Sequence, residues 1–483
     1  MIKLADMDSL PLFEVVHCDP YVAKPYTTHR QTESGDVVSE TPAPIYTDEK
    51  GKKHINHTSF VENFQSINNM ICCNGLFYTP QGTVSEIQVR KDIAYSLTDN
   101  GWTDRIDQPT NALFTALKYM HSVDELPVNE SVIPFRNGDL HLRRGETWEF
   151  RENEKKQAPY RLGVDLVYKE RPMPKFQKWL RDLFDPGDIP TIQEMIGYLL
   201  LPVTNAQEAF FLVGDASAGK SVLGHILGHI INNGFQTINT QDFVTQRFHV
   251  ADAENKLVLY DDDLGSAALT ETGLLKKLIT ADQPIPAERK YERNFMFRSY
   301  AKVVACTNIM LSSLYDDTDG FFRRLHPIHV LPKDPQRKQI AGFGEQIARE
   351  ESEQIVLWAL KGLRRLIYND WHITWSERSR IYFGEVVDKA VHFPIFMQDT
   401  IDQGEPQDDI SSAELFRVYE RWCRENQIQE SKPRRMQTWV NNNIEKYGAV
   451  YSNKVRRNGR FVRGYTGIKA KPEWAESVVR IKI

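Results

Sequence analysis

The segment from Gly214 to Ser221 constrains this chain more than any other feature. It has the sequence GDASAGKS, which fits the pattern GxxxxGK[ST]. An apolar run, AFFLV, precedes it at 209–213, and the apolar VLGHIL follows at 222–227. This pattern between a strand and a helix predicts a loop whose backbone N–H groups surround phosphates. The alternative is a glycine-containing turn that only caps a helix. The phosphate loop requires a buried strand on one side and a helix on the other, so it favours an α/β fold.

The loop residues are candidate nucleotide ligands, and two of them have distinct predicted roles. Lys220 is expected to reach the β and γ phosphates, and the Ser221 hydroxyl is expected to ligate Mg²⁺. ATP and Mg²⁺ are therefore the predicted cofactors. The predicted nucleotide-binding residues are Gly214, Asp215, Ala216, Ser217, Ala218, Gly219, Lys220 and Ser221.

Acidic residues follow a second apolar run. The sequence KLVLYDDDLG predicts a buried strand at 257–260 that ends on three aspartates. Asp261 is predicted to hold the Mg²⁺ shell and Asp262 to orient or deprotonate the attacking water. An acidic cluster after a strand is otherwise a solvated turn, and its distance from the phosphate loop favours the catalytic interpretation.

A third apolar run, at 302–306, ends near Asn308. Asn308 is predicted to orient the nucleophilic water or to contact the γ-phosphate, and its alternative role is to close a turn. Arg323 and Arg324 follow in DGFFRRLHPI. An arginine there is expected to act as a finger in a neighbour's site, which requires an oligomer. A surface salt bridge is the alternative.

Changes in composition and hydrophobic pattern along the chain predict three domains. Residues 1–165 form an α+β accessory domain, of which the first 50 or so are expected to be partly irregular. Residues 166–395 form a helical linker and the ATPase motor, with its core at 205–335. Residues 396–483 form a small C-terminal domain. Thr191 and Glu194 have the spacing of a capping box. Helices are expected at 111–119, 176–184, 191–200 and 344–368, and short strands at 133–135 and 140–142.

Charge is distributed unevenly along the chain. The net charge is −5, yet residues 431–471 carry eleven Lys and Arg against one acid, Glu445. This segment is thus near +10 and the remainder near −15. A basic segment of this kind is typical of a nucleic-acid surface, and a merely solvated basic surface is the alternative. No run approaches the roughly 18 apolar residues of a membrane span, so no membrane partner and a cytoplasmic location are expected.

The phosphate loop, the acidic strand, Asn308 and the arginine pair, in this order, resemble superfamily 3 helicases. These occur in phages, plasmids and mobile elements, with distant relatives in the papillomavirus and polyomavirus initiators and the poxvirus primase-helicase. LLKKLITADQPIPAERKYERNFMF, at 274–297, resembles the family's additional motif. By that resemblance Arg289, Lys290 and Tyr291 lie on a hairpin that touches single-stranded DNA in the ring channel. The family's arginine finger corresponds to Arg324 rather than Arg323.

The resemblance covers roughly residues 60–480. The segments ELFRVYERWCRENQ, SKPRRMQTWVNNNIEKYG and VRRNGRFVRGYTGIK resemble the winged-helix domain that closes many members. Such a domain places a helix near a groove and a basic wing against the DNA backbone. The DNA-binding residues that this implies are Arg434, Arg435, Arg456, Arg457 and Arg460.

The resemblance implies an α/β P-loop ATPase of the AAA+-like, superfamily 3 type, with an α+β N-terminal domain and a C-terminal winged helix. It further implies a ring, as a hexamer, that translocates 3′ to 5′ and unwinds DNA in the replication of a phage or mobile element within a bacterial host. Single- and double-stranded DNA and a separate primase or polymerase are the implied partners. Two alternatives are an origin-binding ATP switch that melts DNA without processive unwinding, and a remodeller that does not act on nucleic acid.

Overall fold

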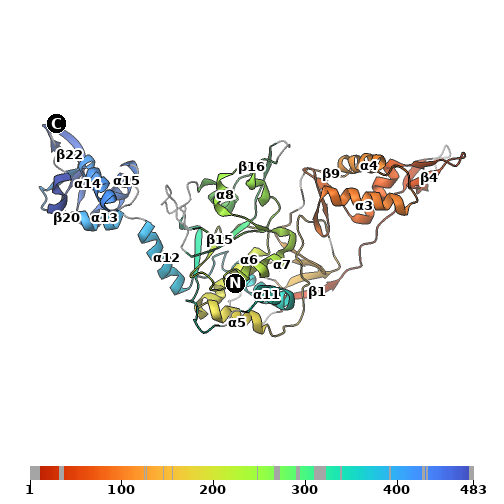
Figure 1. Ribbon diagram of the computed structural model, residues 1–483, viewed down its shortest axis with the longest axis horizontal. Coiled ribbons are helices and arrows are strands. Elements are labelled where there is room, and N and C mark those ends of the chain that lie inside the picture. The colour runs from red at the N-terminus through yellow and green to blue at the C-terminus, as the bar shows by residue number, and fades with distance from the viewer. Residues whose placement is uncertain are drawn as a thin grey trace. The chain divides into compact units, whose positions relative to one another are not determined.

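The computed structural model divides the chain into two compact units (Figure 1). One comprises Met1–Leu311 and Arg323–Arg380, and the other Ser312–Phe322 and Ile381–Ile483. The boundary at Arg380 lies near the end of the predicted motor, residue 395. The structure describes residues 11–31, 37–124, 126, 128–144, 146–154, 156–246, 248–265, 272–289, 294–308, 322–337, 340–390, 393–426, 430 and 433–477.

A five-stranded sheet forms the centre of the first unit, in the order β14-β15-β18-β13-β19, and all of its neighbouring strands are parallel. Parallel sheets are covered on both faces, which accounts for the short, continuously apolar runs that the sequence shows. Every residue of β13 and β18 is buried. The runs predicted as strands are therefore confirmed. The strands are β13 (Ala209–Val213), β14 (Phe235–Thr237), β15 (Val258–Leu264), β18 (Lys302–Thr307) and β19 (Leu325–His329).

Helices connect these strands and pack against the sheet. Helix α7 follows β13 directly, and the long helix α11 packs on both α6 and α7. The α6–α11 contact is close, because a Cβ on Gly197 would lie 2.5 Å from the Ala359 carbonyl oxygen. The helices of this part are α5 (Pro174–Leu183), α6 (Ile189–Leu199), α7 (Val222–Ile231), α8 (Thr240–Thr245), α9 (Gly273–Thr280) and α11 (Phe343–Tyr368). Helix α12 (Glu377–Ala390) begins in this unit and continues into the second.

Carboxylates on facing elements hold this helical layer together. Glu351 of α11 accepts hydrogen bonds from the backbone N–H groups of Lys175 (3.0 Å) and Phe176 (2.7 Å), so it caps the start of α5 from a distant part of the chain. The predicted helices at 176–184, 191–200 and 344–368 are confirmed to within two residues at their ends.

The predicted capping box at Thr191 is wrong. Helix α6 begins two residues earlier, at Ile189, and its N-cap residue makes no side-chain capping bond. The Glu194 carboxylate instead binds Arg365 Nε at 2.5 Å and the backbone N–H of Thr374 at 2.7 Å, and it is fully buried. Burial of this charge is compensated by the tertiary partners, which outweigh the local signal.

The accessory part contains two sheets with helices beside one of them. The predicted helix at 111–119 lies inside α4, and the predicted strands at 133–135 and 140–142 correspond to β10 and β11. One sheet has the order β8-β7-β6-β9 and the other β1-β12-β11-β10. Their elements are α2 (His57–Asn68), β6 (Ile71–Cys73), β7 (Leu76–Thr79), β8 (Gly82–Val84), α3 (Glu86–Asp99), α4 (Asp107–Met120), β9 (Ser122–Val123), β10 (Val132–Phe135), β11 (Gly138–His141) and β12 (Trp148–Glu152).

The described residues among the first 50 are more ordered than their composition predicts. β1 (Phe13–His17) pairs in parallel with β12, with Phe13 opposite Trp148. Two short hairpins follow, so the described part of this segment contains more strand than the expected partly irregular chain. The strand pairs with a partner more than a hundred positions away, which local composition does not report. The hairpin strands are β2 (Thr28–Gln31), β3 (Val37–Glu40), β4 (Ile45–Thr47) and β5 (Lys53–Ile55).

The second unit combines helices with a small antiparallel sheet. Its three-stranded sheet has the order β21-β23-β22, and β20 pairs with β24. Ser411 and Glu414 form a capping box at the start of α14. The elements are α13 (Phe393–Thr400), β20 (Ile401–Gln403), β21 (Asp409–Ser411), α14 (Ser412–Glu425), α15 (Pro433–Asn443), β22 (Val450–Arg457), β23 (Arg460–Thr466) and β24 (Ile468–Ala470).

Candidate functional site

The loop at 214–221 connects the end of β13 to the start of α7, and neighbouring strands fix its first residue. The Gly214 N–H donates to the Thr307 carbonyl at 3.1 Å. A Cβ at Gly214 would collide with the Val330 side chain. Gly219 has a φ of +103°, a backbone conformation that favours glycine. Both glycines of the motif are therefore required by the local geometry.

Lys220 is the most enclosed functional group of the loop. Its Nζ donates to the carbonyls of Gly214 (2.6 Å) and Asp215 (2.8 Å) and to Asn308 Oδ1 (3.1 Å), and the residue is 8% exposed. Burial lowers the pKa of Lys220 below its ordinary value, while the charges of Asp215 and Asp263 act in the opposite direction. The structure thus brings together two residues that the sequence predicts at one site, Lys220 and Asn308.

Two side chains that the sequence did not single out hold the carbonyls of the loop. Trp179 Nε1 of α5 donates to the Gly219 carbonyl at 3.0 Å, and Arg337 donates to the Ala218 carbonyl and, at 3.3 Å, to that of Asp182. The first N–H groups of a helix have no acceptor within the helix itself. A helix start of this kind binds anions.

A cavity of about 490 Å³ lies beside the loop. Such a volume falls in the range of ligand sites in proteins, roughly 300–1,000 Å³. The loop and α7, helix α5 and the start of α11 provide its walls. Its lining includes Ser217, Ser221, Trp179, Asp182, His225 and Arg337.

The three aspartates of β15 occupy different environments. The Asp261 carboxylate is 4% exposed and accepts hydrogen bonds from the N–H groups of Thr240 (2.7 Å) and Asp263 (3.3 Å). Asp262 and Asp263 are exposed. The pairing of β15 with β18 is irregular between Asp261 and Leu264, so the strand bulges at its acidic end. A bulge re-aims side chains. Of the three acids, Asp263 is the one whose charge raises the pKa of Lys220.

Arg324 lies at the amino ends of the parallel strands, whereas Lys220 lies at their carboxyl ends. Its carbonyl accepts from the Ala209 N–H at 2.8 Å, immediately before β19 begins. Since β13 and β19 are parallel, Arg324 lies near the start of β13 and the loop at its end. The five residues of β13 separate these two ends by about 16 Å. Arg324 is partly buried and Arg323 is exposed.

Two short antiparallel strands flank the segment 289–291, which the resemblance places on a hairpin. β16 (Ile285–Ala287) pairs with β17 (Phe295–Phe297). Lys290 and Tyr291 lie outside the described residues. The Arg289 guanidinium forms an ion pair with Glu254 and lies 4.3 Å from the centre of the Phe295 ring. Arg289 thus stabilises the base of the hairpin in this structure.

The C-terminal cations divide into two groups. Arg434, Arg456 and Arg460 are exposed, whereas the side chain of Arg435 lies outside the described residues. Arg457 contacts Asp409 at 2.7 Å and Glu414 at 2.7 Å. The predicted DNA-binding role of Arg457 thus competes with a structural one, because its guanidinium fastens the hairpin to α14 and β21.

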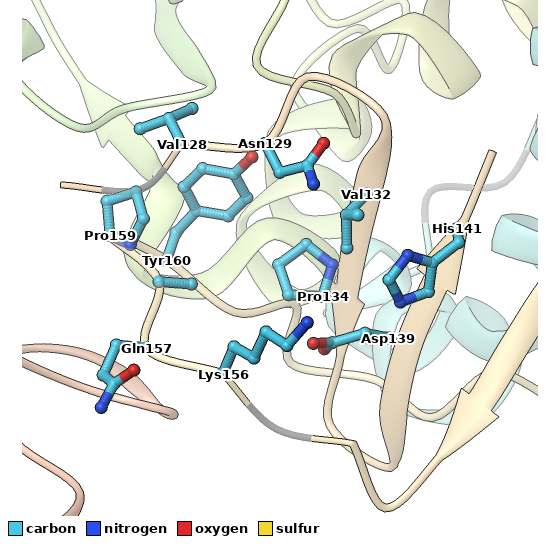
Figure 2. A pocket seen from close by; sticks show the side chains of 11 residues that line it. Val128, Asn129, Val132, Pro134, Asp139, His141, Lys156, Gln157, Pro159 and Tyr160 are labelled. Atoms are coloured by element: carbon cyan, nitrogen blue, oxygen red, sulfur yellow. The ribbon is translucent and has the colours of Figure 1, made fainter.

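A second cavity, of about 330 Å³, lies in the accessory part and contains none of the predicted site residues (Figure 2). Asp139, on its wall, forms a buried ion pair with Arg161 at 2.7 Å. Burial raises the pKa of Asp139, and the charge of Arg161 opposes that effect. Arg161 also donates to the carbonyls of Pro80 and Phe135, so this pair joins the two sheets of the accessory part.

Among the described side chains, no three His, Cys, Asp or Glu residues gather as they would around a metal ion. Mg²⁺ is bound in many nucleotide sites by one or two protein groups together with phosphates and waters. The Ser221 hydroxyl and the exposed carboxylates of β15 fit that requirement. No described helix is both long enough and apolar enough to cross a membrane.

Residues 212–324 match the model of a family of unknown function, DUF5906. That span begins in β13 and ends at Arg324. No curated protein matches the chain. One similar solved structure is an apo structure of the NrS-1 C-terminal region, at 12% identity and a TM-score of 0.47, covering 85% of this chain and 99% of that one. Another, an A-form apo structure of the same region, has 12% identity and a TM-score of 0.43 and covers 73% and 75%. Likenesses this distant establish no shared activity.

Proposed function

We propose that this chain hydrolyses ATP, with Mg²⁺, at the loop 214–221. The observation that carries the proposal is the convergence of Lys220 and Asn308 at 3.1 Å, in a loop whose residues Ser217 and Ser221 line a cavity of about 490 Å³. In open α/β sheets, ligands bind outside the carboxyl ends of the strands where the strand order reverses. β13 has such a position, since the chain crosses from it to the far edge at β14 and later returns to its other side at β19.

Each residue of the site has a chemical task in this proposal. The loop N–H groups and Lys220 hold the phosphates, and phosphate oxygens replace the two backbone carbonyls that Lys220 now contacts. Ser221 and a β15 carboxylate would hold Mg²⁺, which would neutralise phosphate charge. Asp262 or Asp263 accepts a proton from the attacking water, and Asn308 orients that water.

We further propose that hydrolysis drives unwinding of DNA by a ring of subunits, most simply a hexamer, of the AAA+-like superfamily 3 type. Arg324 supports this arrangement, because it lies at the end of the strands away from the loop. From there it is suited to reach a nucleotide bound by a neighbouring subunit rather than one bound by its own subunit. The hairpin β16–β17 would carry Lys290 and Tyr291 to single-stranded DNA, along which the ring would translocate 3′ to 5′. The winged-helix assignment of residues 396–483 supplies a contact to duplex DNA.

The setting that fits these properties is replication of a phage or mobile element in the cytoplasm of a bacterial host, with a separate primase or polymerase. An origin-binding ATP switch would share the site and the DNA contacts but would displace no long strand. A remodeller outside nucleic-acid metabolism would hydrolyse ATP at a rate independent of DNA. The basic C-terminal segment favours the DNA-dependent functions.

Phosphate release from ATP by the full chain tests the first step. Lys220→Ala should abolish hydrolysis, since the group that neutralises the β and γ phosphates is lost. Lys178→Ala is the matched control, because Lys178 lines the same cavity but pairs with Asp182 at 2.8 Å. Full activity of Lys220→Ala would refute the site.

A further inference from the structure

The β22–β23 hairpin of the second unit has one face that points outward. Cross-strand pairing places Arg456 opposite Phe461, so these two side chains share a face. Lys454 lies two residues before Arg456 and Arg463 two residues after Phe461, and both are exposed. We define the outer face of the hairpin as Lys454, Arg456, Phe461 and Arg463.

The opposite face of the hairpin packs into the unit and fixes this orientation. Val455 is fully buried and pairs with Val462. Arg457, whose strand neighbour Arg456 points the other way, forms ion pairs with Asp409 and Glu414. A tight turn at Asn458 and Gly459, with φ of +50° and +75°, joins the strands. Phe461 therefore cannot turn inward without displacing this packing.

Phe461 is 70% exposed although it is a large apolar ring. A single exposed hydrophobic residue is common on protein surfaces. Its neighbours make this one unusual, because cations surround it and Arg460 adds another exposed cation at the turn. From Val450 to Ala470 the sequence has six Lys and Arg and no acid.

An exposed ring among cations fits single-stranded nucleic acid. Cations track the phosphate backbone, and an aromatic side chain provides a surface on which an unpaired base stacks. A protein partner fits less well, since the centres of protein interfaces are depleted of charged residues. Continuous duplex DNA offers no free base face unless a base step is unstacked at a cost.

We propose that the outer face of the hairpin binds single-stranded DNA, with Phe461 stacked on an unpaired base and Lys454, Arg456 and Arg463 on the adjoining phosphates. This goes beyond the proposed ATPase and is independent of it, because the contact requires no nucleotide. It also assigns Arg457 to the support of the hairpin and not to the DNA.

Fluorescence anisotropy of the full chain without nucleotide, on a labelled 20-nucleotide single strand and on the matching duplex, tests the proposal. Phe461→Ala should weaken single-strand binding about tenfold and leave the slope of affinity against salt unchanged, because no charge is removed. Phe461→Trp should retain the affinity. Arg456→Gln should lower the slope by roughly 0.7, the share of one phosphate contact.

Val450→Ala is the matched control, since Val450 is an apolar residue of the same hairpin that is 65% exposed and lies away from the turn. It should bind like the native chain. The native chain and Phe461→Ala should bind a strand of abasic sites with equal affinity, because such a strand offers no base on which Phe461 could stack.

Unchanged single-strand affinity in Phe461→Ala would overturn the proposal. So would an equal loss on single strand and duplex, or a change in self-association of the chain without a change in DNA affinity. Failure of the ATPase proposal is a separate result. It would appear as intact hydrolysis in Lys220→Ala, whereas the binding of single-stranded DNA by that variant should equal that of the native chain.

Discussion

The Lys220 ammonium donates a hydrogen bond to the Asn308 side-chain carbonyl across 3.1 Å. This bond joins the loop after β13 to the end of β18, two segments that are adjacent in the sheet but 88 positions apart in sequence. Asn308 thereby links Lys220 to the neighbouring strand. In the proposed mechanism this position suits a polar group that contacts the terminal phosphate.

Asn308→Ala should reduce the rate of ATP hydrolysis about 100-fold, the usual effect of removing one donor from a preorganised site. Nucleotide affinity should change only a few-fold, because the loop N–H groups and Lys220 remain. Steady-state hydrolysis and binding of a non-hydrolysable ATP analogue measure the two effects separately. An equal loss in both would mean that Asn308 shapes the loop rather than the reaction.

Substitution of the β15 aspartates should separate support from chemistry. Asp261→Asn should lower the free energy of unfolding by about 1–3 kcal/mol, because its buried carboxylate binds two backbone N–H groups. Asp262→Asn and Asp263→Asn, at exposed positions, should leave stability within about 0.5 kcal/mol and lower hydrolysis. Urea unfolding and phosphate release measure these effects. Loss of hydrolysis in Asp261→Asn at unchanged stability would support a direct Mg²⁺ role for Asp261.

Arg457→Met should destabilise the second unit by about 2 kcal/mol at pH 7, since it leaves Glu414 and Asp409 without their guanidinium. Burial raises the pKa of Glu414, but the hydrogen bonds from Arg457 and Ser411 outweigh burial and lower it overall. A lowered carboxyl pKa stabilises the fold above the pKa of the unfolded chain, and that stability is lost as pH falls through the folded pKa.

The difference between native and Arg457→Met chains should therefore shrink as the pH falls below about 4. Hydrogen exchange of peptides from 409–466 measures it, with Arg456→Met as the control because Arg456 is exposed. A difference that stays constant with pH would show that the lost packing of the arginine stem, and not its charge, destabilises the variant.

Two glycine-to-alanine substitutions should have opposite effects on stability. Gly197→Ala places a Cβ 2.5 Å from the Ala359 carbonyl oxygen and 2.8 Å from Leu363 Cβ, so α6 and α11 must separate, at a cost of about 2 kcal/mol or more. Gly228→Ala in α7 meets only ordinary contacts, at 3.6 Å and beyond, and should stabilise by about 0.5–1 kcal/mol. Chemical denaturation measures both. A stable Gly197→Ala chain would contradict the close helix packing.

The strands of the central sheet could be predicted from the sequence, because buried parallel strands are continuously apolar and the loop motif marks where one of them ends. The proximity of Asn308 to Lys220 followed from the same reasoning. Trp179, Arg337 and Glu351 could not be predicted in this way. Each acts on backbone atoms in a distant segment, and neither the residue type nor its spacing reports such a contact.

Two local signals misled for physical reasons. Thr191 and Glu194 have the spacing of a capping box, yet Arg365 and Thr374 offer Glu194 stronger, buried partners. Residues 13–17 alternate too little to predict a strand, and β12 supplies the pairing that orders them. In both cases tertiary partners decided the conformation.

The most direct test of the central claim is ATP-dependent strand displacement on forked DNA with either a 3′ or a 5′ single-stranded tail. The native chain should unwind from the 3′ tail. Lys220→Ala should fail through loss of hydrolysis, and Lys290→Ala should fail while retaining basal hydrolysis. ATP hydrolysis at a rate independent of DNA, with no displacement from either fork, would contradict the account.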